Sequence, residues 1–142
     1  MLVEGLVTSR KHIRVVGAMV EGETGHYLIT QRAKDASLPL LWEFPGGRVQ
    51  PNETDVAALV RELKERLRID VDVLEQASTL HHAYPHYDLD FSVFYCRLRG
   101  GDVEVSHHRV NDHKWVTLAE MSKYPFPDAD AKTLEKLLDL DR

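Results

Sequence analysis

A pair of glycines followed by a helical pattern is the feature that most constrains this chain. Gly46 and Gly47 end an apolar run, and a short loop then leads to Thr54. Threonine is a good helix cap, and Asp55 would stand in the first turn, where the helix dipole favours an anion. We therefore predict a glycine turn that leads into a helix over residues 55–67.

Apolar side chains recur along this predicted helix at helical spacing. We expect one buried face made by Val56, Leu59, Val60, Leu63 and Leu67. At about 100° per residue, Glu62, Glu65 and Arg66 share a separate stripe. The helix would thus bury one face and present glutamates on another, which suits a divalent cation and a phosphate chain.

These residues resemble the Nudix box, the signature of the Nudix hydrolase superfamily. Its pattern is a glycine, five residues, a glutamate, seven residues, and then Arg-Glu-apolar-x-Glu-Glu-x-Gly-apolar. The positions that match without a gap are Gly47, Glu53, Arg61, Glu62, Leu63, Glu65 and Ile69. Two positions depart from the pattern: Arg66 stands where the family has its last glutamate, and Arg68 stands where it has glycine.

The resemblance covers nearly the whole chain. Residues 28–33, 41–47 and 124–130, together with Trp115, are similar to the small MutT-type branch, which includes 8-oxo-dGTP and CTP pyrophosphohydrolases. The resemblance implies an α/β fold, an α/β/α sandwich with a central mixed β-sheet.

The pattern of the remaining chain agrees with that fold class. We predict strands over residues 13–20, 26–32, 69–80, 87–98 and 114–116, an edge segment within 103–108, a short helix over 118–121 capped by Thr117, and a last helix over 129–140. Residues 42–47 would lead into the Nudix-box helix. Such strands and helices favour a mixed sheet with helices on its faces. We expect one domain over residues 1–142, in which 1–11 are a loose lead-in.

The implied reaction is the Mg²⁺- or Mn²⁺-dependent hydrolysis of a nucleoside triphosphate to the monophosphate and pyrophosphate. By resemblance, Glu62 and Glu65 would ligate the metal together with the Gly46 carbonyl. Glu62, or a water that it holds, would act as the base. Glu53 would position metal or water, and Arg61 would orient Glu65.

The resemblance also implies a substrate pocket. Arg32 would meet phosphate, and Phe44 and Asp130 would bound the base pocket. Without the resemblance, Arg32 is equally well a surface charge, Phe44 a core residue and Asp130 a residue at a helix N-terminus. CTP, dCTP, methylated dCTP and 8-oxo-dGTP all remain open as substrates.

The arginines that replace family residues leave two functions open. Arginine cannot ligate a metal, and at about 4 Å and an effective dielectric near 20 its charge repels each unit of cation charge by roughly 4 kcal/mol. Relatives often carry another glutamate shortly before the tryptophan, where this chain has Arg109. Arg66 can pair with Glu62 one turn earlier, or it can bind phosphate. The chain is therefore either a weakened hydrolase or a nucleotide- or phosphate-binding module that does not cleave.

The amino-acid composition of the chain narrows the range of possible binding partners. A net charge of −5 argues against non-specific binding to long nucleic acid, and no apolar run is long enough to predict a membrane span. The single cysteine, Cys96, fits a reducing cytoplasm and a buried apolar role. The six histidines between residues 81 and 113 match no zinc spacing, so we expect no dedicated zinc site. Monomer and homodimer are both compatible with the sequence.

Overall fold

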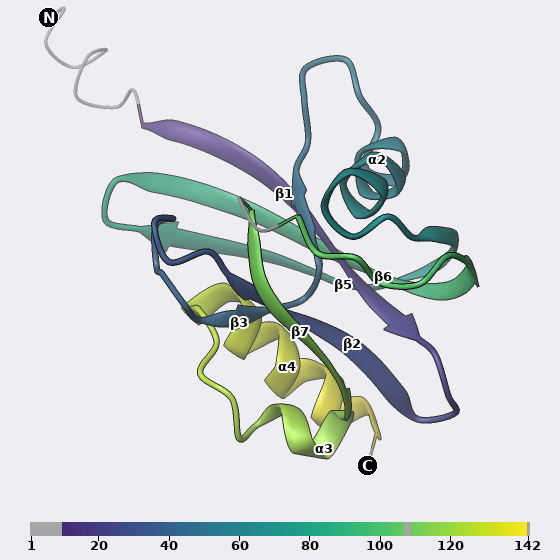
Figure 1. The fold of residues 1–142 in the computed structure, drawn as a ribbon. Coiled ribbons are helices and arrows are strands. Elements are labelled where there is room, and N and C mark those ends of the chain that lie inside the picture. Colours follow the sequence, from purple (N-terminus) through teal and green to yellow (C-terminus); the bar gives the residue numbers. More distant parts are fainter. Residues whose placement is uncertain (1–9, 107–108, 142) are drawn as a thin grey trace, which may run out of the picture.

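The structure, a computed structural model, describes residues 10–106 and 109–141 (Figure 1). Its elements are β1 (Lys11–Glu21), β2 (His26–Arg32), β3 (Trp42–Glu43), β4 (Gly46–Arg48), α2 (Asp55–Leu67), β5 (Asp70–Tyr84), β6 (Tyr87–Gly100), β7 (Val110–Thr117), α3 (Leu118–Met121) and α4 (Asp128–Asp141). None of the helices in these two ranges is long and apolar enough to cross a membrane.

The seven strands within the described ranges form one mixed sheet. The strand order is β3-β2-β1-β6-β5, while β4 pairs with β1 and β7 pairs with β2. The long pairing of β1 with β6 is parallel, and the other pairings are antiparallel. The predicted mixed sheet is therefore confirmed.

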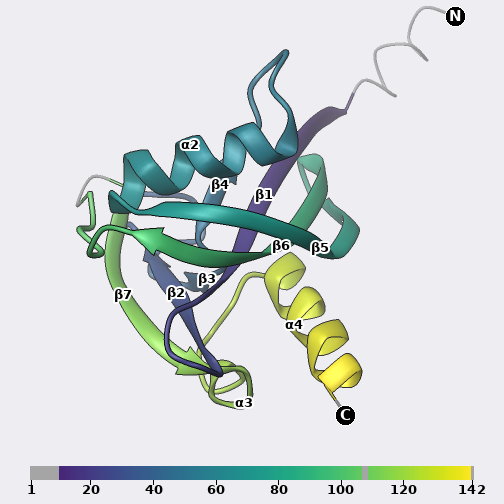
Figure 2. The same ribbon diagram turned by 90° about the vertical axis from the view of Figure 1, so that its right-hand side faces the viewer.

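Helices cover both faces of this sheet, as Figures 1 and 2 show. On one face α2 packs over a core that includes Val16, Leu28 and Leu63. On the other face α3 and α4 pack over a second core that includes Met19, Ile29 and Phe91. This arrangement confirms the predicted α/β architecture with helices on both sides.

The first two strands pair with one another only near the hairpin that joins them. Glu21 pairs with Tyr27, and from there the two strands take different partners. Beside β1, residues 15–17 pair with β4, whereas β2 pairs with β3 and β7. The separation of β1 from β2 makes room for the pocket described below.

The helix α2 begins and ends where the sequence predicts. The Thr54 side chain caps it by accepting a hydrogen bond from the Ala57 N–H at 3.1 Å. At the other end, Arg68 adopts the left-handed conformation, with φ 59°, and its N–H bonds to the Lys64 carbonyl. The arginine thus takes the backbone conformation that the family glycine suits, and the helix end does not shift.

The predicted apolar face of α2 is partly wrong. Leu59, Leu63 and Leu67 are buried, but Val56 is 44% and Val60 39% exposed. The buried arc extends instead to the other side of Leu59, where it includes Ala58 and Glu62. The sheet contacts the glutamate side of the helix because β4 lies directly beneath it.

Three further expectations need correction or qualification. β3 and β4 are strands that the sequence did not predict, because their pairings with β2 and β1 define them and no local pattern does. Residues 103–106 form no strand, and the rest of that expected edge segment, 107–108, lies outside the described residues. Most of the expected lead-in, residues 1–9, lies outside them too, while Lys11 is already the first residue of β1.

Candidate active site

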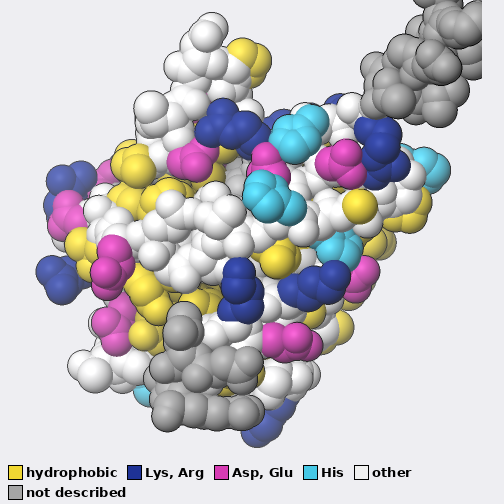
Figure 3. All heavy atoms as spheres, turned by 180° about the vertical axis from the view of Figure 1, so that it is seen from behind, with side chains coloured by type: hydrophobic (Ala, Val, Ile, Leu, Met, Phe, Trp, Pro, Cys, Tyr) yellow, Lys and Arg dark blue, Asp and Glu magenta, His cyan; other side chains and the backbone are white. Residues whose placement is uncertain are grey.

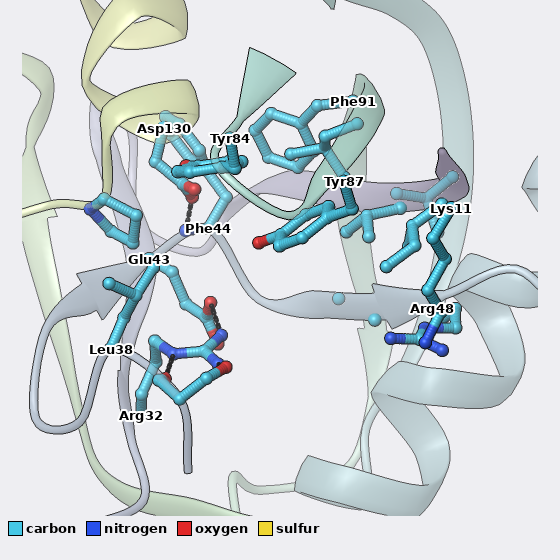
Figure 4. Close-up of a pocket in the computed structure, with 18 of the residues that line it drawn as sticks. Lys11, Arg32, Leu38, Glu43, Phe44, Arg48, Tyr84, Tyr87, Phe91 and Asp130 are labelled. Atoms are coloured by element: carbon cyan, nitrogen blue, oxygen red, sulfur yellow. Dashed lines mark hydrogen bonds and ion pairs between the residues drawn. The ribbon is translucent and has the colours of Figure 1, made fainter. Parts of the chain in front are cut away.

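A pocket of about 450 Å³ lies where β1 and β2 separate (Figure 4). In the close-up, Arg32 and Glu43 lie together on one side, and Lys11 and Arg48 lie on the opposite side. Residues of β1, β3, β4, β6 and the start of α4 line it. The pocket thus draws on segments that are distant in the sequence.

The two glycines lie in strand β4 and not in a turn as the sequence predicted, and close contacts surround both of them. A Cβ on Gly46 would lie 1.9 Å from the Val16 carbonyl oxygen in β1. A Cβ on Gly47 would lie 2.0 Å from an oxygen of the Glu62 carboxylate. Both distances are far below van der Waals contact. At Gly46 the neighbour is backbone, so only glycine fits, whereas at Gly47 a larger residue would force the Glu62 side chain to move. The Glu62 carboxylate therefore lies directly against β4.

Glu62 is buried, with only 2% of its surface exposed, and it contacts three arginines. Arg109 Nη2 donates to its Oε1 at 2.9 Å, and Arg66 Nε donates to the same oxygen at 3.2 Å. Arg61 Nη1 lies 3.6 Å away from that oxygen. The pairing of Arg66 with Glu62, one of the two arrangements that the sequence left open, is present in the structure.

The other two glutamates of the Nudix box also contact arginine. Glu65 Oε2 lies 3.3 Å from Arg109 Nη1 and 3.4 Å from Arg61 Nη1. Glu53 accepts from Arg61 Nε at 2.7 Å and Nη2 at 2.9 Å. The hydrogen bonds from Arg61, helped by one from the backbone N–H of Gln50, lower the pKa of Glu53 to about 2. Arg61 is thus bound more closely to Glu53 than to Glu65.

The residues present do not fit a divalent cation in this arrangement. Mg²⁺ requires several oxygen ligands in near-octahedral geometry. Here the three glutamates face three arginines, Arg61, Arg66 and Arg109, so the formal charges of the cluster cancel. In the part of the chain that the structure describes, no three histidine, cysteine, aspartate or glutamate side chains are grouped as a metal centre would need. Ligation by Glu62, Glu65 and the Gly46 carbonyl stays a prediction.

Arg32 lines the pocket at the end of β2. Its Nη1 donates to Glu43 Oε1 at 2.9 Å, and its Nε donates to the Ser37 carbonyl at 2.8 Å. A contact of Arg32 with phosphate stays a prediction, as do the other roles taken from the resemblance.

Asp130 and Phe44 lie together at another side of the pocket. The Phe44 N–H donates to Asp130 Oδ2 at 3.1 Å. Burial, together with the nearby charge of Glu43, raises the pKa of Asp130 well above its usual range. The Phe44 ring packs on Phe91 and Phe126, with centroids 6.4 Å and 5.7 Å away, so it is at once a core residue and a pocket wall.

Two tyrosines in the pocket were missed by the sequence analysis. The rings of Tyr84 and Tyr87 stack with centroids 5.1 Å apart, and the Ala129 N–H donates to the Tyr84 hydroxyl. The alternation along β6 contained the signal, because Tyr87 stands two and four residues before Leu89 and Phe91, which also line the pocket. No comparable pattern marks Tyr84, which lies across the hairpin turn on β5.

Several histidines lie beside charged side chains on the surface shown in Figure 3. His12 and His81 each contact a different oxygen of Asp90. His82 contacts Lys132 Nζ at 3.0 Å and lies 3.8 Å from Asp128.

Cys96 is buried, as expected, and burial raises the pKa of its thiol to about 12. Such a thiol is unsuited to nucleophilic catalysis at neutral pH.

Comparison with known proteins identifies the class to which this fold and site belong. The sequence profile of the NUDIX domain family matches residues 15–136. The chain therefore belongs to the Nudix family, as the motif indicated.

The similar proteins are of MutT type. The chain is 32% identical over 130 residues to the CTP pyrophosphohydrolase of Escherichia coli (strain K12), covering 92% of this chain and 94% of that protein. It is 26% identical over 127 residues to the 8-oxo-dGTP diphosphatase of the same organism, covering 89% and 97%. The solution structure of the E. coli ORF135 protein superposes with a TM-score of 0.79 at 30% identity, covering 94% and 93%.

Proposed function

We propose that this protein binds a nucleoside triphosphate in the 450 Å³ pocket and hydrolyses it slowly to the monophosphate and pyrophosphate. The observation that carries the proposal is the contact of Gly47 with Glu62, which places the buried carboxylate of α2 against a strand that lines the pocket. The nucleobase would lie near Asp130, Phe44 and Tyr87. The phosphates would extend toward Gly47 and Arg66.

The charges around the pocket support an anionic ligand. Lys11, Arg32, Arg48 and Arg66 line it, against the acidic residues Glu43 and Asp130. This local excess of basic side chains contrasts with the net charge of −5 for the whole chain. A nucleotide requires a pocket with one end that selects the nucleobase and another end whose basic side chains meet the phosphates.

The relatives suggest the substrate class. Because two of them are named for CTP and 8-oxo-dGTP, we propose a triphosphate with a cytosine-like or 8-oxoguanine-like base. Asp130 would contact an exocyclic amine or a ring N–H of that base. The reaction would form a bond from water oxygen to phosphorus and break the α,β-phosphoanhydride bond, giving the monophosphate and pyrophosphate, while Glu62 would take a proton of the water.

We propose a slow rate because Arg66 and Arg109 neutralise the carboxylates that the family uses for Mg²⁺ or Mn²⁺. Each guanidinium repels a cation and occupies an oxygen that a metal would need. These same contacts favour a second candidate function, a module that binds the nucleotide and does not cleave it.

Release of pyrophosphate from CTP, dCTP, 5-methyl-dCTP and 8-oxo-dGTP, with Mg²⁺ or Mn²⁺ present, tests the proposal. We expect slow turnover of one member of this panel, and we expect Glu62→Gln to reduce it by a hundredfold or more, in the range typical for loss of an acid–base group. Turnover that survives Glu62→Gln would contradict the role of Glu62. Binding of a nucleotide with no turnover under any of these conditions would establish the second candidate.

A further inference from the structure

A second hollow, about 190 Å³ in volume, adjoins the main pocket. Its lining residues are Arg32, Ala33, Ala36, Glu43, Arg66 and Arg109. Three of these, Arg32, Glu43 and Arg66, also line the main pocket, so the two spaces are neighbours that share these side chains. We call this hollow the arginine pocket.

Arginine side chains dominate the lining of the arginine pocket, although Arg66 and Arg109 also pair with Glu62 and Glu65, which do not line it. Three arginines stand against the single carboxylate of Glu43, and the two alanines leave the space open. Arginine is suited to such a place because its planar group presents several N–H donors to phosphate oxygens. The composition of the lining therefore favours a phosphate group as ligand.

Arg66 and Arg109 keep unused N–H donors beside their hydrogen bonds to glutamate. Arg66 uses its Nε for Glu62, and no hydrogen bond among the described residues uses its two terminal nitrogens. Arg109 bonds through its Nη1 and Nη2, while its Nε makes no hydrogen bond to another described residue. Each guanidinium has five N–H donors, so both can hold a carboxylate and a phosphate together.

We propose that Arg66 and Arg109 bind the terminal phosphates of the nucleotide directly, so that binding of the triphosphate needs no divalent cation. The two guanidiniums supply the positive charge that a metal would otherwise supply beside Glu62. This inference rests on the proposed function, because a nucleotide in the main pocket would extend its phosphate chain into the arginine pocket. It also explains why the acidic cluster does not fit a cation.

Calorimetric titration of inorganic pyrophosphate in EDTA tests this proposal without any nucleotide or turnover. We expect binding in EDTA that added Mg²⁺ does not strengthen, and we expect Arg109→Gln and Arg66→Gln each to weaken it at least tenfold. Arg99→Gln is the matched control, because Arg99 lies on β6, pairs with Asp72 at 3.6 Å and lines neither pocket. This control should bind as the unmodified chain does.

Binding of pyrophosphate only in the presence of Mg²⁺ would overturn the proposal, as would equal binding by the unmodified chain and the Arg109→Gln variant. Because Arg66→Gln and Arg109→Gln each remove a partner of the buried Glu62 carboxylate, Arg109→Lys is measured beside them. Lysine keeps the positive charge next to Glu62 but presents fewer N–H donors, so a folded Arg109→Lys variant should also bind pyrophosphate more weakly than the unmodified chain. A chain that binds pyrophosphate in EDTA but cleaves no nucleotide would refute only the hydrolysis. A chain that cleaves a nucleotide yet binds no pyrophosphate in EDTA would refute only the arginine pocket.

Discussion

Glu62 is the residue on which the site depends. A buried carboxylate without partners is strongly destabilising, and in this chain three arginines surround it. Breaking such a buried cluster by removing one partner typically costs about 3–5 kcal/mol. The arginines therefore have a structural role in addition to the phosphate-binding role that we propose for two of them.

At the same scale, the ion pair of Glu53 with Arg61 leads us to predict that the free energy of unfolding depends on pH. The pKa of Glu53 is lowered to about 2 in the folded chain by its hydrogen bonds from Arg61. Its contribution to stability is therefore fully present above its unfolded pKa, about 4.3, and is lost as the pH falls from there to about 2. We expect Glu53→Gln to show a weaker loss of unfolding free energy over this pH range, measured by urea denaturation.

The control for this prediction is Glu23→Gln, which changes an exposed glutamate in the turn between β1 and β2. It should follow the unmodified chain across the same pH range. An equal pH dependence for Glu53→Gln and the unmodified chain would show that the pair with Arg61 does not stabilise the fold.

At the scale of elements, α2 shows why some features could be predicted and others could not. The cap at Thr54 and the end at Leu67 follow from residues within one or two turns of each other, and both are confirmed. The Arg66–Glu62 pair, one of two arrangements that the sequence left open, is present. The exposure of Val56 and Val60 depends on where β4 lies beneath the helix. That position follows from pairing with β1, which no local pattern determines.

The left-handed residue at the end of α2 is a place where we expect a substitution to stabilise the fold. Arg68 holds a left-handed conformation that costs a residue with a Cβ about 1–2 kcal/mol. Glycine removes this cost but gains freedom in the unfolded chain, so we expect Arg68→Gly to raise the free energy of unfolding by about 0.5–1 kcal/mol. Arg68→Ala removes the same side chain and keeps the strain, so it should give no gain in urea denaturation. Equal stability of the two variants would contradict strain at this helix end.

At the scale of the whole molecule, the separation of β1 from β2 creates the pocket. The Nudix-box motif and its flanking segments predicted the fold and the presence of Phe44 and Asp130 in one pocket, and the structure brings these two residues together. The pocket residues Lys11 and Tyr87 could not be predicted in this way, because they meet through the parallel register of β1 and β6. The reach of Arg109 to Glu62 likewise depends on tertiary contacts, although the resemblance to relatives with a glutamate before the tryptophan had marked the position as altered.

Our central claim is that Arg66 and Arg109 have replaced the positive charge of a metal and thereby slowed hydrolysis. The most direct test is pyrophosphate release, with Mg²⁺ present, by the unmodified chain and by a variant that carries Arg66→Glu and Arg109→Glu. We predict at least a tenfold increase in kcat for the variant, which corresponds to about 1.4 kcal/mol in the barrier. Rapid hydrolysis by the unmodified chain, or a variant that is folded by urea denaturation yet hydrolyses no faster, would contradict the claim.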